Sequence, residues 1–228
     1  MTKPIPQPGY DPACRDCPRL AKFLDRVRRD HPDYHARPVP SFGPRRAGLL
    51  VVGLAPGMHG ANRTGRPFTG DYAGILLYQT LHKYGFANQG GSDRADDGLK
   101  LIGCRVTNAV KCLPPQNRPL PEEVRRCNHY LAEEIAVVRP HAILALGAIA
   151  HGAVLRALGL ALARHRFAHR AVHDLAGPLG ARLFDSYHCS RYNTQTKRLT
   201  VSSFESVMRA IVHFLRSPDE SPKHSPPA

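Results

Sequence analysis

The sequence has no long apolar run and no apolar segment near its start. Its longest apolar stretch, residues 142–150, spans nine residues, whereas a membrane-spanning helix needs about 20. The first ten residues are polar and rich in proline, unlike the apolar core of a secretion signal. We therefore expect a soluble, cytoplasmic protein that does not associate with a membrane.

Acidic residues are also scarce. The 228-residue chain has 18 Asp and Glu against 32 Lys and Arg, which gives a net charge of +14. A basic balance of this size is typical of proteins that bind a polyanion such as nucleic acid. The alternative is an arginine-rich protein whose surface charge is scattered without such a partner.

Cysteine is present but does not form the pattern of a secreted protein. Six cysteines in a chain without an export signal argue against a disulfide framework. Cys14 and Cys17 form a Cys-x-x-Cys pair, and Cys112 and Cys127 would complete a set of four thiolates. Four thiolates suit either an iron–sulfur cluster or tetrahedral zinc, and their spacing does not decide between the two. For Cys127 alone, the alternative is a small apolar side chain on a buried helix face.

Strand-like apolar runs alternate with helical patterns along the chain. This alternation predicts a three-layer α/β/α fold with a central, mainly parallel four-stranded sheet. The expected strands are 49–52, 104–110, 142–147 and 182–187. The expected helices are 17–30, 71–85, 121–138, 148–158 and a last helix that begins with a capping box, Ser202 to Glu205. Residues 159–181 are expected to be irregular. We expect one domain over residues 1–216 and a disordered tail over residues 217–228.

A glycine-rich loop follows the first expected strand. Residues 53–71 contain five glycines, and glycine lets a ligand approach the main chain closely. Ordered loops of this length are usually functional, and ligands bind where the strands of an α/β sheet end. Phe68 offers an aromatic face in this loop, and Asp71 stands where the next helix would begin.

A second polar stretch, residues 188–200, follows the last expected strand. It combines one histidine with Arg, Lys, Tyr and many small hydrogen-bonding side chains. Such a loop at the same sheet edge suits contact with a phosphate backbone, whereas the alternative is a flexible, solvated loop.

Together these stretches resemble a family 5 uracil-DNA glycosylase. Gly-Leu-Ala-Pro-Gly (53–57) through Arg-Thr-Gly-Arg-Pro-Phe-Thr-Gly-Asp (63–71) resembles the first motif of that family. The stretch 188–200 resembles its His-x-Ser-x-x-Asn-Thr-x-Thr-x-x-Leu-Thr motif, and Thr-Asn-Ala-Val-Lys-Cys (107–112) resembles the middle motif. The resemblance runs from about Cys14 to the last helix.

The resemblance implies a monofunctional DNA N-glycosylase of bacterial or archaeal type that acts in DNA repair as a monomer. Its partner would be DNA that contains uracil or another deaminated base such as hypoxanthine. The enzyme would flip the base out and hydrolyse its glycosidic bond, leaving an abasic site. The resemblance also assigns Cys14, Cys17, Cys112 and Cys127 to a structural [4Fe–4S] cluster.

The resemblance also assigns roles to individual residues. The implied catalytic residues are Asp71, His188 and Asn108. The implied base-binding residues are Gly53, Leu54, Ala55, Phe68 and Asn108. Independently of the resemblance, the cationic and small polar side chains of the loop 190–198 lead us to expect DNA contacts from Arg191, Asn193, Thr194 and Lys197. Arg191 would fill the space that the flipped base leaves.

The chain departs from related families in two respects. Leu54 and Ala55 stand where many relatives carry an acidic residue, so a carboxylate must come from elsewhere, and Asp71 is the candidate. Cys189 occupies a place usually held by an apolar residue, so we do not expect it to bind the cluster.

Two other functions fit part of these features. A non-catalytic, metal-stabilised module could bind damaged or single-stranded DNA and leave uracil in place. A nucleotide hydrolase could use the glycine loop to hold phosphate. However, the loop lacks the Gly-x-x-x-x-Gly-Lys-Ser/Thr pattern, and its only cations are Arg63 and Arg66.

Overall fold

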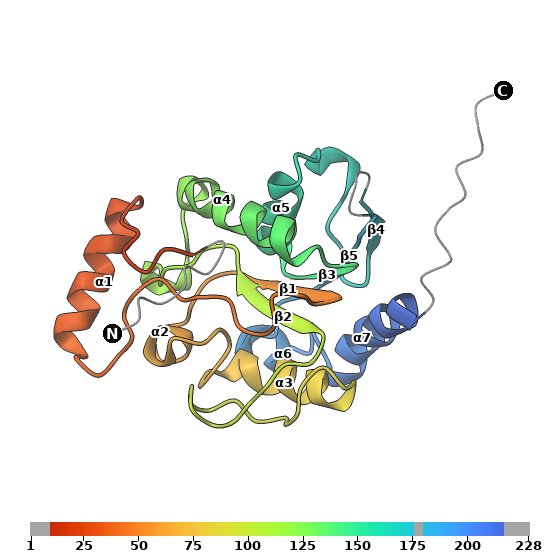
Figure 1. Ribbon diagram of the computed structural model, residues 1–228, viewed down its shortest axis with the longest axis horizontal. Coiled ribbons are helices and arrows are strands. Elements are labelled where there is room, and N and C mark those ends of the chain that lie inside the picture. The colour runs from red at the N-terminus through yellow and green to blue at the C-terminus, as the bar shows by residue number, and fades with distance from the viewer. Residues whose placement is uncertain (1–9, 176–179, 217–228) are drawn as a thin grey trace.

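A five-stranded sheet forms the centre of the computed structural model, which describes residues 10–175 and 180–216 (Figure 1). The strand order is β2-β1-β3-β5-β4. The first four strands in that order run parallel, and β4 runs antiparallel to β5. The strands are β1 (Leu49–Gly53), β2 (Cys104–Asn108), β3 (Ala142–Leu146), β4 (Val172–Asp174) and β5 (Arg182–Ser186).

Helices cover both faces of the sheet, as the predicted three-layer fold requires. Figure 1 shows α4 and α5 above the strands and α3 and α7 below them. The helices are α1 (Pro18–Asp30), α2 (Ala61–Thr64), α3 (Tyr72–Lys83), α4 (Pro121–Val138), α5 (Ala148–Ala157), α6 (Arg191–Gln195) and α7 (Val201–Arg216). Two short 3-10 turns lie at Pro115–Asn117 and Leu162–Arg164.

Alternate residues of the central strand β1 enter two separate cores. Leu49 and Val51 of β1 pack into the cluster that includes residues of α3 and α7. Leu50 and Val52 of the same strand pack into the cluster that includes residues of α4 and α5. Because side chains alternate across a strand, a continuous apolar run can fill both layers.

The predicted fold class is confirmed, but the sheet has one strand more than expected. Strand β4 lies inside the stretch 159–181, which we expected to be irregular. It is mostly polar and has only three residues, all of which pair with β5. Such an edge strand lacks the apolar alternation by which strands are recognised in a sequence.

The predicted capping box of the last helix is wrong by two residues. Thr200, rather than Ser202, caps α7: its Oγ1 accepts a hydrogen bond from the Ser203 amide at 3.1 Å. The Thr200 amide in turn donates to Ser203 Oγ at 3.0 Å. Glu205 instead pairs with Lys83 of α3 at 2.6 Å, so it fastens two helices together.

The expected C-terminal tail, residues 217–228, lies outside the described residues. Within the described ranges, no helix has both the length and the apolar composition that a bilayer span requires.

Candidate active site

An open pocket of about 420 Å³ lies where strands β1, β2 and β5 end. The parallel register pairs Gly53 of β1 with Asn108 of β2, so the first and middle motifs meet at one edge of the sheet. The amides of Ala109 and Val110 donate to the carbonyls of Gly53 and Leu54 at 2.9 and 3.0 Å. These bonds fix the two motifs to each other. The pocket is lined by Leu54, Ala55, Gly57, Ala61, Phe68, Asp71, Tyr72, Ala73, Asn108, Asn117, His188 and Ser190.

Gly53 leaves room for two of the predicted base-binding side chains. A Cβ atom at this position would lie 2.4 Å from Asn108 Oδ1 and 2.4 Å from Cζ of Phe68. Such distances are shorter than any van der Waals contact, so a side chain here would displace the ring or the amide. The glycine therefore lets both groups reach the floor of the pocket.

Phe68 is held in an unusual backbone conformation. Its φ is +55°, which is uncommon for a bulky residue and marks a position that the surroundings enforce. Its carbonyl oxygen approaches Gly74 of α3 so closely that a Cβ there would lie 1.8 Å away. The ring is almost wholly buried beneath the pocket, and this position suits an aromatic platform for a planar ligand.

Asn108 presents an unpaired polar atom at the pocket. Its side-chain oxygen is buried and has no hydrogen-bond partner among the described residues. Buried polar groups are nearly always hydrogen-bonded, and an exception needs an explanation. A ligand that donates a hydrogen bond would supply the missing partner.

Asp71 begins helix α3, as the sequence predicts. Its Oδ1 accepts a hydrogen bond from the Gly74 amide at 2.9 Å. The carboxyl group also lies against the backbone of Gly60, where a Cβ would approach it to 2.4 Å. Burial raises the pKa of Asp71, and hydrogen bonds from the Gly74 and Ala73 amides oppose that rise. Capping the helix and lining the pocket are therefore compatible for this side chain.

His188 faces Phe68 across the pocket. Their ring centroids are 6.0 Å apart, with a 30° angle between the planes. Burial lowers the pKa of His188 to about 4, so the imidazole is neutral near pH 7. The Asn193 side chain donates to the His188 carbonyl at 2.8 Å, which ties α6 to the end of β5.

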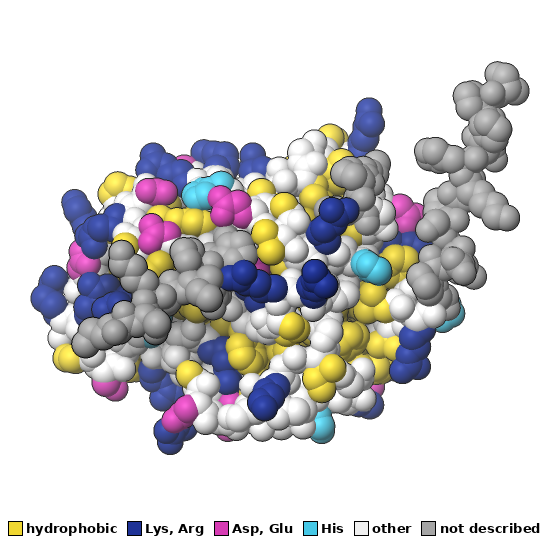
Figure 2. Space-filling model, in the orientation of Figure 1, with side chains coloured by type: hydrophobic (Ala, Val, Ile, Leu, Met, Phe, Trp, Pro, Cys, Tyr) yellow, Lys and Arg dark blue, Asp and Glu magenta, His cyan; other side chains and the backbone are white. Residues whose placement is uncertain are grey.

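The stretch that we expected to be a loop after His188 contains the short helix α6. Ser190 caps it, and the Arg191 guanidinium at its start lies 5.1 Å from the ring centre of Tyr72. Thr194 Oγ1 donates to the Tyr72 hydroxyl at 3.2 Å. Lys197 is exposed and has a left-handed backbone, with φ of +58°. Figure 2 shows Lys and Arg side chains spread over much of the visible face.

Several residues that line the pocket were not among the predicted site residues, and Asn117 and Tyr72 are the most informative of them. Asn117 lies in the 3-10 turn after the middle motif and has a left-handed φ of +56°. The Pro-Pro-Gln-Asn run at 114–117 was an available turn signal. Tyr72 follows Asp71 directly, but helical periodicity does not reveal that its ring supports Arg191.

The four predicted metal-binding cysteines line one small pocket. Cys14 lies shortly before α1, and Cys17 is the residue directly before that helix. Cys112 follows β2, and Cys127 lies on α4. None of the four is in a disulfide. Their mutual proximity adds to burial in raising the pKa of Cys17 to about 11. Four thiol sulfurs in a largely apolar pocket fit the donor set of an iron–sulfur cluster. Cys189 is wholly buried in a different core.

Arg66, one of the two cations in the glycine loop, is not available for phosphate. It is buried and forms an ion pair with Asp97 at 2.6 Å. It also donates to Thr69 Oγ1 at 2.7 Å. The arginine therefore stabilises the loop from within, which weighs against a nucleotide hydrolase.

Comparison with known proteins assigns the chain that carries this pocket to a family. A model described as "Uracil DNA glycosylase superfamily" matches residues 40–212, so the chain belongs to that superfamily. A type-5 uracil-DNA glycosylase of Thermus thermophilus is 46% identical over 203 residues, which cover 86% of this chain and 91% of that protein. One from Pyrobaculum aerophilum is 44% identical over 200 residues, 86% of each chain.

Similarity to another branch is weaker. A type-4 uracil-DNA glycosylase of Pyrobaculum aerophilum is 38% identical over 127 residues, only 55% of this chain and 57% of that protein. The chain therefore belongs among the type-5 proteins of the superfamily, as the motifs predict.

Proposed function

We propose that this protein is a DNA repair glycosylase that excises uracil from DNA by hydrolysis and leaves an abasic site. The observation that carries the proposal is the pocket at the sheet edge. It combines an aromatic platform, an unpaired amide oxygen, a carboxyl group and a neutral imidazole: Phe68, Asn108, Asp71 and His188.

The chemistry explains why such a pocket is needed. A stacked base is inaccessible, so the enzyme extrudes it at a cost of a few kcal/mol, which is lower for a mispaired base. As the glycosidic bond breaks, the sugar gains positive character and the departing base gains negative charge. Preorganised donors near the base oxygens stabilise that negative charge.

In this proposal the extruded base stacks on Phe68, and Asn108 accepts a hydrogen bond from its edge. His188 donates a hydrogen bond to a base oxygen through one ring N–H. Its lowered pKa supports this role, because the imidazole is then neutral when the reaction begins and still carries one N–H donor. Backbone amides from Gly53 to Ala55 supply further donors.

Asp71 acts on the sugar side of the bond. With neither Leu54 nor Ala55 offering a carboxylate, Asp71 is the carboxyl group that lines this pocket. It orients the attacking water or stabilises the cationic sugar. The hydrogen bond from the Gly74 amide supports its ionised form, because a charged acceptor benefits most from an N–H donor.

We propose that the pocket also accepts other deaminated or modified bases, namely hypoxanthine, xanthine and ethenocytosine. A pocket whose walls are mainly backbone and apolar groups discriminates loosely between ring systems. The volume of about 420 Å³ and the open mouth support this breadth.

Cys14, Cys17, Cys112 and Cys127 would hold a [4Fe–4S] cluster with a structural role. When bound, the cluster would link the segment before α1 to β2 and α4. The Lys111 amide donates to Cys127 Sγ at 3.3 Å, and such hydrogen bonds to sulfur are typical around iron–sulfur clusters.

The DNA contacts come from α6 and the residues after it. Arg191 enters the vacated stack, Lys197 contacts phosphate, and Asn193 and Thr194 shape the turn that carries them. A single domain over residues 1–216, a monomeric state and a cytoplasmic location stay predictions of the sequence.

A cleavage panel tests the function. Oligonucleotides with one defined lesion each are incubated with the protein, treated with alkali and sized. Uracil strands should be cut with turnover, and strands without a lesion should stay intact. The alternative, a non-catalytic DNA-binding module, predicts retention of uracil DNA without any cleavage.

A further inference from the structure

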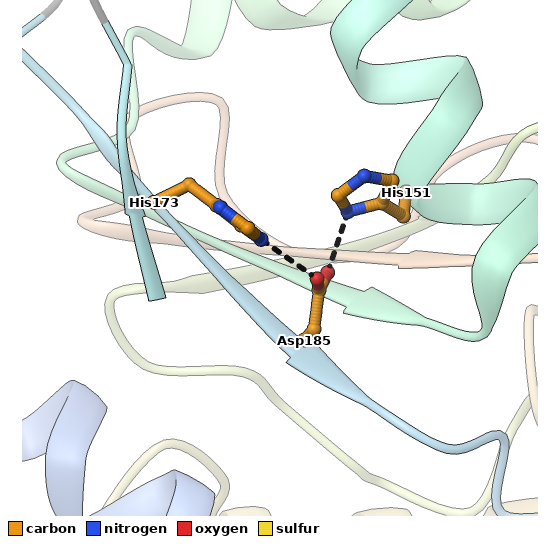
Figure 3. A group of neighbouring side chains, drawn as sticks. All are labelled: His151, His173 and Asp185. Atoms are coloured by element: carbon orange, nitrogen blue, oxygen red, sulfur yellow. Dashed lines mark hydrogen bonds and ion pairs between the residues drawn. The ribbon is translucent and has the colours of Figure 1, made fainter. Parts of the chain in front are cut away.

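Three polar side chains meet on the α4 and α5 side of the sheet and have no part in the proposed chemistry. They are His151 of α5, His173 of β4 and Asp185 of β5 (Figure 3). His151 Nδ1 lies 2.9 Å from Asp185 Oδ1, and His173 Nε2 lies 3.0 Å from Asp185 Oδ2. One ligand atom from each residue falls within 4.8 Å of the other two.

The cluster of His151, His173 and Asp185 is largely buried, so the negative charge of its carboxylate needs a nearby positive charge. Asp185 is fully buried, and His151 is 3% exposed. A buried carboxylate is costly unless a positive group compensates it. Its two ion-pair partners are imidazoles, which carry a charge only when they are protonated. Either a proton or a metal cation can therefore supply the positive charge here.

The hydrogen bond on the far side of His151 matches the arrangement around bound metals. His151 Nε2 lies 2.8 Å from the carbonyl oxygen of His165, so Nε2 is the donor and Nδ1 faces Asp185. Histidines that bind metals characteristically donate their other N–H to a carbonyl or carboxylate, which fixes the ring and the tautomer.

We propose that His151 Nδ1, His173 Nε2 and the Asp185 carboxylate bind one zinc ion. Two imidazole nitrogens and one carboxylate oxygen are ligands that zinc takes at about 2.0–2.2 Å in a tetrahedral site. These bond lengths hold ligand atoms about 3.3 Å apart, so small side-chain rotations suffice. Solvent completes the fourth position, because His173 lies on the partly exposed edge strand.

Zinc at this position has a structural consequence. Strand β4 pairs with β5 through three residues only, and Val172 is exposed. A metal held by α5, β4 and β5 would fasten this weak edge strand to the core. The same strand β5 leads from Asp185 directly toward His188, so the end that carries the pocket histidine would be held as well.

Zinc binding to the full chain tests the proposal without reference to activity. The protein is titrated with zinc sulfate, and zinc and iron are counted by mass spectrometry. We expect one zinc ion per chain in addition to the iron present. His173→Gln should weaken zinc binding by about 100-fold or more, because removal of even an outer-shell partner costs 10–100-fold. The matched control is His141→Gln, which changes an exposed histidine outside the group, and it should bind zinc like the wild type.

X-ray absorption at the zinc edge gives a second readout that needs no variant. Nitrogen and oxygen ligands near 2.0–2.1 Å would support the proposed site. Sulfur ligands near 2.3 Å would place the zinc at the cysteines and overturn it. Equal zinc affinity of wild type and His173→Gln, or no zinc bound at all, would likewise overturn it and leave a proton as the compensating charge. None of these zinc measurements tests uracil excision, so the zinc proposal can fail while the proposed function stands.

Discussion

The side-chain oxygen of Asn108 approaches Gly53 so closely that a Cβ atom there would lie 2.4 Å from it. The two residues are register partners at the ends of adjacent parallel strands. The glycine of the first motif and the asparagine of the middle motif therefore depend on each other. The Phe68 ring, from the glycine-rich loop, approaches Gly53 equally closely. Gly53, Asn108 and Phe68 together form the floor of the pocket.

Gly53→Ala should damage the pocket without unfolding the protein. The added methyl must displace Phe68 or Asn108, and overpacking of this kind costs about 1–3 kcal/mol. If that cost falls on base binding, kcat/KM for uracil DNA drops about 5- to 150-fold. Gly91→Ala is the matched control, because its Cβ would meet nothing within 4 Å. Equal activity of both variants would contradict the crowding argument.

Asp71→Asn should separate catalysis from helix capping. Asparagine caps a helix about as well as aspartate, so the melting temperature should change little. Loss of a positioned carboxylate should slow single-turnover cleavage of uracil DNA by about 10²–10⁴-fold. A rate within about threefold of the wild type would show that Asp71 only caps α3.

His188→Ala should slow the chemical step by roughly 10²–10³-fold, because it removes a preorganised donor. DNA binding should change much less, since the half-buried ring lines the base pocket rather than the surrounding DNA-facing surface. Single-turnover rates and binding isotherms measured on the same substrate distinguish the two effects. Much weaker binding with an unchanged rate would contradict the assignment.

The same variant has a pH signature. The pKa of His188 in the folded protein is about 4, below the value of about 6.5 in an unfolded chain. Between these two values the unfolded chain binds more protons, so the free energy of unfolding should fall as pH drops from about 6.5 to 4. His188→Ala should show a shallower fall over that window in chemical denaturation, and an identical slope would argue against a buried neutral imidazole.

Arg191→Ala should matter most where a stable pair must be opened. Its guanidinium already lies over Tyr72 beside the pocket, a position suited to filling the vacated stack. We expect the largest rate loss on U·A duplex, less on U·G and least on single strands. Lys197→Ala is the comparison: it should weaken binding to all three DNAs evenly and lower the salt slope by about one. An equal loss on all three substrates for Arg191→Ala would reject the wedge.

The cysteine pocket should hold iron and sulfide in a ratio that fits one [4Fe–4S] cluster. Quantitation on anaerobically purified protein measures this directly. Cys17→Ser should lower the iron content and the melting temperature together, because the cluster links the segment before α1 to α4. Cys189→Ser serves as the control for cysteine loss, since Cys189 is buried elsewhere. Stoichiometric zinc at these cysteines without iron would contradict the cluster.

Local features of the structure were predictable from the sequence. The apolar run 49–52 and the glycines after it determine a buried strand that breaks into a loop. Asp71 determines the start of α3, because a carboxylate that accepts backbone N–H bonds fits a helix N-terminus. Each of these depends on neighbours within a few residues, so sequence order is enough to identify them. The wrong N-cap predicted for α7 has the same origin. Thr200 and Ser202 are both good helix caps, and only the packing of the helix determines which of them caps it.

Tertiary structure decided which distant residues meet. Asn117 reaches the pocket because its turn is folded back beside Asn108, and no periodicity in the sequence predicts that. His151 and Asp185 are 34 residues apart and meet at 2.9 Å only because β5 pairs with β3 beneath α5. Strand β4 exists because β5 offers a free edge for pairing, whereas its own residues carry no apolar pattern. Local sterics and hydrogen bonds are encoded by adjacent residues, but long-range contacts depend on strand order and register, which are settled when the layers pack.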